Sequence, residues 1–204
     1  DVCSSDLPNS DELIAKLRSA VPSVRSIQLN IQTKRGTTIL GDTCKTLFGD
    51  DTLSDNIGDL HFDLAMPAFF QVNPEQTRVL YQKAVDACAL TGHETVWDIY
   101  CGAGTITLNL AKGAKVVYGN EIHPKAIENA RSNALLNNIL NAHFIVGPAE
   151  EVIPKWLVEH PRAEVVVLDP PRKGAEPAVL DAIIKMAPER IVYVSCKQIG
   201  RAHV

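Results

Sequence analysis

The stretch TVWDIYCGAGT, which runs from Thr95 to Thr105, decides the fold. Its first half is a continuous apolar run typical of a buried strand, and its second half is a glycine-rich turn that leads into a helical pattern. The same alternation returns along the chain, which predicts strands at 95–100, 116–120, 142–146, 165–168 and 190–195 and helices at 77–89, 105–111, 124–137 and 178–186. Continuous apolar strands separated by helices indicate an α/β, Rossmann-like domain, in which helices cover both faces of a parallel sheet.

The chain before this alternation has a different pattern. A helix is expected where Leu13, Ile14, Leu17 and Val21 recur at helical spacing. Short strands are expected after it, at 24–33, 37–40, 48–53 and 60–64, with a hairpin-like turn at 34–36. This pattern predicts a partial antiparallel α+β domain over residues 8–66, followed by the parallel-sheet domain over residues 67–197.

The two ends of the chain share an unusual relation. Codons for Asp1–Leu7 can be chosen so that their reverse complement encodes Gln198–Val204, as a sequencing adaptor read through both ends of an insert would do. We therefore expect 1–7 and 198–204 to be adaptor-derived and to contribute nothing to the fold. On this hypothesis the parallel-sheet domain is truncated after its fifth strand.

Composition excludes several classes of protein. Five widely spaced cysteines form no CxxC pair or His/Cys cluster, so no metal site is expected. No apolar run is long enough to span a membrane, and a cytoplasmic location with free thiols is the simplest interpretation. The formal net charge of −4 argues against nucleic-acid binding, which usually shows a basic footprint.

Polar or reactive groups stand where the predicted strands end, which is where parallel sheets bind ligands. A glycine turn over 101–104 follows the first strand, and Glu121 ends the next one, at the spacing where an acid reaches ribose hydroxyls. This arrangement fits NAD as well as S-adenosylmethionine. Because Thr107 stands where a dinucleotide fingerprint has its third glycine, a dinucleotide is disfavoured.

Two later strand ends carry more specific signals. In Asp169-Pro170-Pro171 the prolines fix the backbone and present the acid rigidly, as suits methylation of planar amines or bases. Cys196 follows an apolar run, and a thiolate at the ligand side of a strand is a nucleophile for an electrophilic carbon. The alternative interpretations are a rigid turn with an exposed acid and a buried structural thiol.

Four segments in this order resemble the RNA uracil-5-methyltransferases, most nearly those that act on bacterial 23S ribosomal RNA. They are Phe69–Pro74, Asp98–Thr105, Asp169–Gly174 and Val192–Cys196. The resemblance implies that S-adenosylmethionine is the cofactor and contacts Gln71, Tyr100, Glu121 and Asp169, and that Cys196 is the catalytic nucleophile. It also implies an RNA partner, ribosomal or transfer RNA, and 5-methyluridine as the product of RNA processing.

The sequence also departs from the family pattern. After Ser-Cys the family continues Asn-Pro, whereas Lys197 follows here, and the expected glutamate base and N-terminal RNA-binding domain are not present. We therefore expect this chain by itself to be inactive, and we expect a monomer, although the oligomeric state is left open. Two alternatives remain: an S-adenosylmethionine-dependent N-methyltransferase that needs no thiol, and a non-catalytic RNA-binding remnant.

Overall fold

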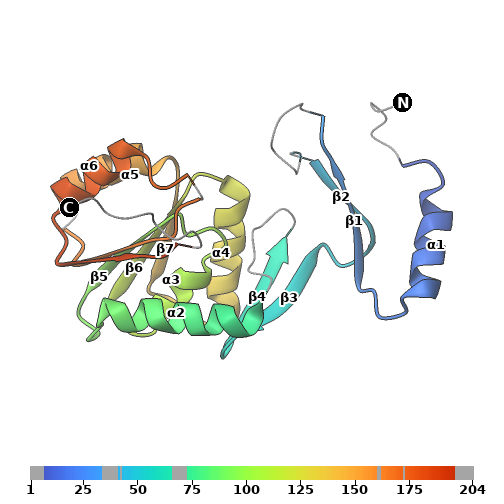
Figure 1. Cartoon of the computed structure of the whole chain (residues 1–204), viewed down its shortest axis with the longest axis horizontal. Helices are drawn as coiled ribbons and strands as arrows, with labels where there is room; N and C mark the ends of the chain where they lie inside the picture. Colours follow the sequence, from blue (N-terminus) through green and yellow to red (C-terminus); the bar gives the residue numbers. More distant parts are fainter. Residues whose placement is uncertain are drawn as a thin grey trace. The chain divides into compact units, whose positions relative to one another are not determined.

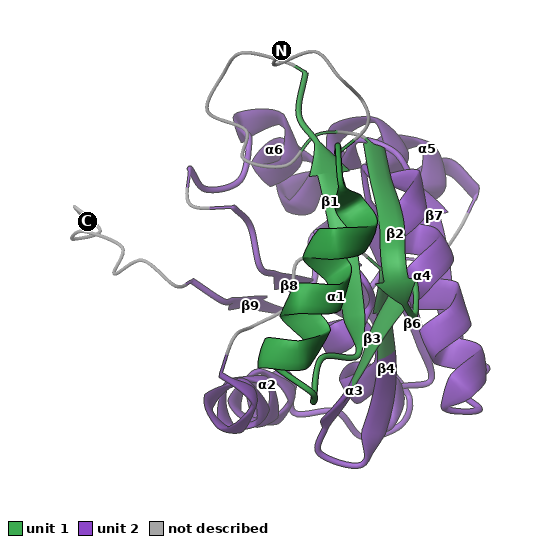
Figure 2. Ribbon diagram, turned by 90° about the vertical axis from the view of Figure 1, so that its right-hand side faces the viewer, with its two compact units in different colours: residues 1–54, 63–68 green, residues 55–62, 69–204 purple. Residues whose placement is uncertain are grey.

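The computed structural model describes residues 7–33, 41, 43–65, 73–159, 162–171 and 173–195. The chain divides into two compact units (Figure 2). Unit 1 comprises Asp1–Ser54 with Asp63–Ala68, and unit 2 comprises Asp55–Phe62 with Phe69–Val204.

Unit 2 is built on a five-stranded parallel sheet with the strand order β7-β6-β5-β8-β9. Its strands are β5 (Thr95–Ile99), β6 (Val116–Glu121), β7 (Ala142–Val146), β8 (Val165–Leu168) and β9 (Arg190–Tyr193). Its helices are α2 (Pro74–Cys88), α3 (Thr105–Ala111), α4 (Pro124–Leu136), α5 (Ala149–Glu159) and α6 (Pro177–Met186). The chain moves from β5 outward to β7 and then returns past β5 to β8, so right-handed crossovers place α5 and α6 on the face opposite α3 (Figure 1). The predicted doubly covered parallel sheet is confirmed.

The core of unit 2 lies between the sheet and its helices. All four residues of β8 are buried, as expected for a strand covered on both faces. Trp97 of β5 meets Trp156 of α5 edge to face, with ring centroids 4.6 Å apart, and Tyr118 of β6 stacks beside it. These aromatic contacts join α5 to the central strands.

Helix α5 was not expected from the sequence. Pro154 lies inside it, and an internal proline normally interrupts a helical pattern. Pro154 nevertheless stands in the sixth position of the helix, and Ile153 and Trp156 on either side of it are buried against the core. Burial of this apolar side of α5 therefore outweighs the hydrogen bond that Pro154 removes.

Helix α2 begins three residues earlier than the apolar pattern indicated. Pro74 occupies the first turn, where its missing N–H costs nothing, and the side chain of Asn73 accepts a hydrogen bond from the Gln76 amide at 3.1 Å. The cap extends the helix to Pro74.

Unit 1 contains α1 (Ser10–Ala20) and an antiparallel pair of β1 (Ser26–Ile31) with β2 (Thr43–Gly49). The expected helix is confirmed. The expected turn at 34–36 and strand at 37–40 lie outside the described residues.

The single strand expected over 48–53 is wrong, because the chain turns at Asp50-Asp51 between β2 and β3 (Thr52–Ile57). Gly49 makes this turn with φ +76°, at a point where a Cβ would lie 1.8 Å from the Arg25 carbonyl oxygen.

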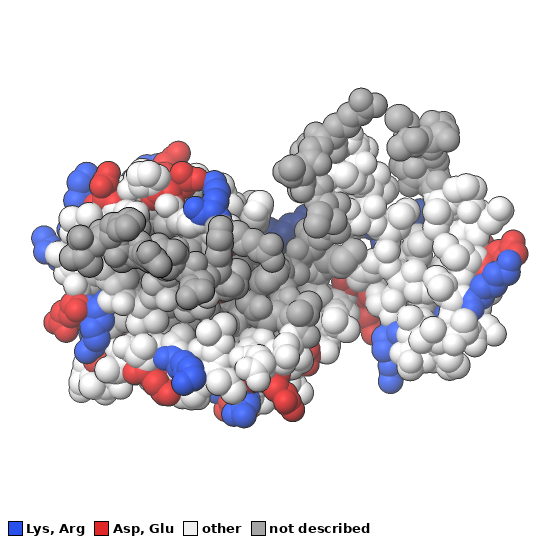
Figure 3. All heavy atoms as spheres, in the orientation of Figure 1, with Lys and Arg blue, Asp and Glu red and all other residues white. Residues whose placement is uncertain are grey.

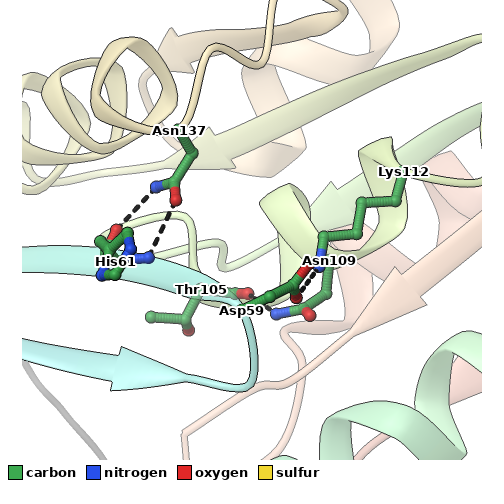
Figure 4. A network of polar contacts seen from close by, with 6 residues as sticks. All are labelled: Asp59, His61, Thr105, Asn109, Lys112 and Asn137. Atoms are coloured by element: carbon green, nitrogen blue, oxygen red, sulfur yellow. Dashed lines mark hydrogen bonds and ion pairs between the residues drawn. The ribbon is translucent and has the colours of Figure 1, made fainter.

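A second antiparallel hairpin pairs β3 with β4 (Leu60–Ala65). Its tip, residues 55–62, packs within unit 2, where Ile57, Leu60 and Phe62 are buried. Polar contacts hold the tip as well (Figure 4): Asn137 beyond α4 bonds the backbone of His61, and Lys112 beyond α3 pairs with Asp59. The hairpin tip is thus anchored to the ends of two helices of the sheet domain.

Candidate active site

The carboxyl ends of the parallel strands meet at one edge of the sheet. Backbone hydrogen bonds continue past the strand ends: the Tyr100 and Cys101 amides both bond the Asn120 carbonyl, at 2.9 and 3.0 Å, and the Gly147 amide bonds the Glu121 carbonyl at 3.0 Å. The strand order reverses between β5 and β8, and ligands of open α/β sheets bind outside the carboxyl ends at such a reversal. Tyr100, Glu121 and Asp169 all follow or end strands at this edge.

The glycine turn after β5 has a left-handed backbone. Tyr100, Gly102 and Gly104 have φ values of 70°, 55° and 82°. A Cβ on Gly104 would lie 3.1 Å from the Ala130 side chain, so this glycine allows α4 to pack closely against the turn. At Gly102 a Cβ would meet nothing within 4 Å, which leaves open space beside the backbone. The turn can therefore approach a ligand closely.

Glu121 is held by backbone amides on both sides of its carboxylate. One oxygen accepts a hydrogen bond from the Gly102 amide at 3.3 Å, and the other accepts one from the His123 amide at 3.0 Å. Since each carboxylate oxygen has a further lone pair and the side chain is only half-buried, Glu121 can accept hydrogen bonds from a ligand's hydroxyl groups. Its orientation is fixed before any ligand arrives.

Asp98 is a feature of the site that the sequence reasoning missed. This residue of β5 is 1% exposed, and one of its carboxyl oxygens accepts a hydrogen bond from the Thr107 hydroxyl at 2.5 Å. The other oxygen is buried without a partner among the described residues. Burial raises the pKa of Asp98 to about 7. Asp98 lies within the stretch 95–105, but only the fold shows that one of its oxygens has no partner among the described residues.

Asp169 and Tyr100 complete the described part of the edge. Burial raises the pKa of the Asp169 carboxyl, which follows β8 and precedes the buried Pro170. Burial also raises the pKa of the half-buried Tyr100 phenol. A carboxyl and an aromatic ring of this kind suit a ligand that combines polar groups with a flat base.

Cys88 and Cys101, which are buried thiols in the described part of unit 2, are poor nucleophiles. Burial raises the pKa of Cys88 to about 11 and raises the pKa of Cys101 well above its usual range. Both thiols therefore stay protonated near neutral pH.

Two of the expected site residues, Gln71 and Cys196, lie outside the described residues. Among the residues that are described, no group of three or more His, Cys, Asp or Glu side chains could hold a metal ion.

The edge fits the ligand that the sequence suggested. Glu121 offers oriented acceptors for ribose hydroxyls, Gly102 leaves space beside the turn, and Asp98 has a buried oxygen that still needs a donor. The ammonium, hydroxyl and base groups of S-adenosylmethionine would satisfy this set of acceptors.

A family model described as tRNA (Uracil-5-)-methyltransferase matches residues 13–200. The chain belongs to this family. An uncharacterized RNA methyltransferase of Halalkalibacterium halodurans is 50% identical over 191 residues, which cover 94% of this chain and 42% of the relative. One from Bacillus cereus is 51% identical over 193 residues, which cover 95% of this chain and again 42% of the relative. This member of the family thus spans less than half the length of these curated relatives.

Solved structures share the fold of this chain. The Pyrococcus abyssi tRNA (uracil-54, C5)-methyltransferase, in complex with S-adenosyl-L-homocysteine, matches with a TM-score of 0.72 and 27% identity over 95% of this chain and 45% of that one. An S-adenosylmethionine-dependent methyltransferase from Agrobacterium tumefaciens matches with a TM-score of 0.60 over 88% of this chain and 62% of that one; at 18% identity it shows the fold alone. The predicted Rossmann-like methyltransferase fold is confirmed, and the predicted cofactor, S-adenosylmethionine, agrees with the family.

No described helix is long and apolar enough to cross a membrane.

Proposed function

We propose that the protein containing this chain transfers a methyl group from S-adenosylmethionine to carbon 5 of uridine in RNA. The observation that carries the proposal is the gathering of Tyr100, Glu121 and Asp169 at one edge of the sheet, in a chain that belongs to the uracil-5-methyltransferase family. The cytoplasm is the proposed location, since the relatives are named RNA methyltransferases of bacteria.

We assign cofactor binding to Gln71, Tyr100, Glu121 and Asp169. Glu121 would accept hydrogen bonds from the ribose hydroxyls, because two backbone amides already orient its carboxylate. Tyr100 and Asp169 would contact the cofactor at the same sheet edge, and Gln71 is assigned from the sequence resemblance alone. The bound cofactor supplies an electrophilic methyl group on a sulfonium.

We assign the nucleophile to Cys196, which follows β9 in the sequence. Its thiolate would add to carbon 6 of uracil, and the electron pair displaced toward carbon 5 would attack the methyl group. A base would then take the proton from carbon 5, and the thiolate would leave as the double bond between carbons 5 and 6 forms again. The covalent route is needed because an unactivated uracil carbon is too weak a nucleophile to attack a methyl group.

The RNA substrate has two candidates. Ribosomal RNA is the one that the sequence resemblance favours. Transfer RNA is favoured by the family description and by the Pyrococcus abyssi relative, whose substrate is a tRNA. Either RNA would have to present its target base unstacked from its neighbours.

Trapping with 5-fluorouridine tests the nucleophile and the base together. The complete gene product is incubated with S-adenosylmethionine and with 23S ribosomal RNA segments or tRNA that carry 5-fluorouridine. Since fluorine replaces the proton that must leave, the covalent complex should accumulate and appear by mass spectrometry on Cys196. Cys196→Ala should abolish the adduct, whereas the matched control Cys44→Ser, which changes a half-buried thiol of unit 1, should keep it.

The outcomes separate the alternatives. If methyl transfer to RNA persists in Cys196→Ala and no adduct forms, the thiol mechanism is wrong and methylation of a nitrogen is favoured. If S-adenosylmethionine does not bind at all, the sheet edge is not a cofactor site and the enzyme proposal fails.

A further inference from the structure

A groove of about 480 Å³ lies within unit 1, on elements separate from the parallel sheet. Its walls come from the last turn of α1, the connection to β1 and the end of β2. The residues that line it are Arg18, Pro22, Ser23, Val24, Arg25, Phe48 and Asp50.

Local hydrogen bonds hold the walls of this groove. The Val21 amide bonds the Leu17 carbonyl at 2.8 Å, and the Val24 amide bonds the Val21 carbonyl at 3.1 Å, so the chain leaving α1 makes a defined turn. On the opposite wall the Ser26 hydroxyl donates to the Asp50 carbonyl at 2.7 Å. The groove is therefore part of the folded unit.

The groove combines an aromatic ring with two guanidinium groups. The Arg18 guanidinium stands over the Phe48 ring, 4.0 Å from its centroid. Neither Arg18 nor Arg25 forms an ion pair with an acidic side chain in the described part of the chain, although Asp50 lines the same groove. Arg18 is favoured at the end of α1 by the helix dipole, but Arg25 is exposed and has no such role. Two sets of guanidinium donors thus remain available beside an aromatic ring.

We infer that this groove binds a nucleotide of the RNA substrate other than the base that is methylated. Guanidinium groups bind phosphate, and proteins recognise unpaired RNA bases by stacking them on aromatic rings or on arginine planes. The Asp50 carboxylate can accept a hydrogen bond from a base N–H, which favours uracil or guanine. The inference rests on the proposed function, because it assumes that RNA is the substrate.

The net charge of this chain gives no general attraction to RNA, so the inference rests on the local contact alone. On the face drawn in Figure 3, described acidic and basic residues are interspersed, and the net charge is −4. A chain of this balance adds little long-range attraction for RNA, so any RNA contact that it makes depends on defined sites. The Arg18–Phe48 groove offers such a site.

RNA affinity of single variants tests the inference. We would titrate the complete gene product with a fluorescent single-stranded RNA at several salt concentrations and follow anisotropy. Arg18→Gln and Arg25→Gln should each weaken binding about fivefold or more and lower the salt slope by about one. Phe48→Leu should weaken binding about 5- to 100-fold and leave the salt slope unchanged, because it removes the ring that holds the Arg18 guanidinium as a plane for stacking. Lys16→Gln is the matched control, since Lys16 lies on α1 in an exposed pair with Glu12.

Each result has one meaning. A loss of affinity in the three groove variants but not in Lys16→Gln supports the inference, provided that S-adenosylmethionine binding is unchanged. Wild-type affinity in Arg25→Gln and Arg18→Gln overturns it and leaves the proposed function standing. Failure of the unaltered protein to bind any RNA overturns the inference and the proposed RNA substrate together. Phe48 is half-buried, so thermal unfolding would be used to check that Phe48→Leu still folds. If it does not fold, the RNA affinities of the two exposed arginine variants test the inference without it.

Discussion

Glu121 and Asp98, two acidic residues at the same sheet edge, differ in burial and in hydrogen bonding. Glu121 is half-buried and oriented by two amides, so it can meet a ligand as a charged acceptor. Asp98 is buried, has one oxygen without a partner among the described residues, and has a pKa raised to about 7 by burial. A buried carboxylate without a full set of partners lowers the free energy of unfolding when it is charged. Residues that carry such a cost are found mostly at functional sites.

The pH dependence of stability should reveal Asp98. Its folded pKa of about 7 lies above the ordinary value of 3.8, so the folded state binds more protons between these values. The stability that the neutral carboxyl contributes is present below the unfolded pKa and is lost as pH rises through 7. Without cofactor, Asp98 should lower the unfolding free energy of the unaltered protein by about 2–3 kcal/mol between pH 5 and pH 8. Asp98→Asn cannot titrate, so this part of the decrease should be absent in the variant.

Urea denaturation at the two pH values measures this difference. Asp181→Asn is the matched control, because Asp181 is an exposed acid on α6. If Asp98→Asn and Asp181→Asn show the same pH dependence as the unaltered protein, Asp98 is charged in the folded state and its burial does not raise its pKa.

Among the elements, the tip of the β3–β4 hairpin shows how a local side chain can join distant segments. Asn137, just after α4, accepts from the His61 amide at 2.8 Å and donates to the His61 carbonyl at 2.6 Å. One amide side chain thus satisfies both backbone groups of a residue in β4, much as a neighbouring strand would. Beneath it, Ile57 and Phe62 supply the apolar part of the anchor.

Removing that amide should loosen the hairpin tip without unfolding the sheet. Asn137→Ala loses both bonds to His61, and because they lie near solvent the cost should be about 1–2 kcal/mol of unfolding free energy. Ser132→Ala, an exposed change on α4, should alter the unfolding free energy by less than about 0.5 kcal/mol. Chemical denaturation checks both variants, and equal stabilities would show that the apolar contacts alone hold the tip.

The elements also show where sequence reasoning reached its limit. Strands such as Val165–Leu168 could be predicted because burial on both faces leaves a continuous apolar run. Helix α5 could not, since Pro154 breaks its pattern and the compensating contact of Trp156 with Trp97 is tertiary. Glu121 followed from spacing, whereas the unpartnered oxygen of Asp98 depends on what packs around β5. The assignments of Gln71 and Cys196 stay predictions.

On the scale of the whole molecule, the two units differ in how much they bury. In unit 2 the sheet is enclosed by helices, and Val96, Trp97 and Ile99 of β5 are fully buried. In unit 1, among the described residues from 7 to 54, only Gly41 is buried, and α1 has no buried residue at all. Since stability follows buried apolar contacts, the two units of this chain should open with different free energies.

Hydrogen exchange with mass spectrometry measures that difference and ties it to the site. In the 204-residue chain, peptides from α1 should exchange far faster than peptides from β5 and β8. S-adenosylhomocysteine at 100 times its dissociation constant contributes about 2.7 kcal/mol, which should slow exchange through global opening of unit 2 about 100-fold.

The α1 peptides should not respond to this ligand, because its predicted contacts lie at the sheet edge. Glu121→Gln should reduce the ligand's effect at equal concentration, and Glu128→Gln, an exposed change on α4, should not. Protection of α1 equal to that of β5 would contradict the difference in burial. A ligand effect that is identical in Glu121→Gln and in the unaltered chain would remove Glu121 from the cofactor site. The sheet edge would then hold its ligand through Tyr100, Asp169 and the glycine turn without the acid that spacing and geometry both single out.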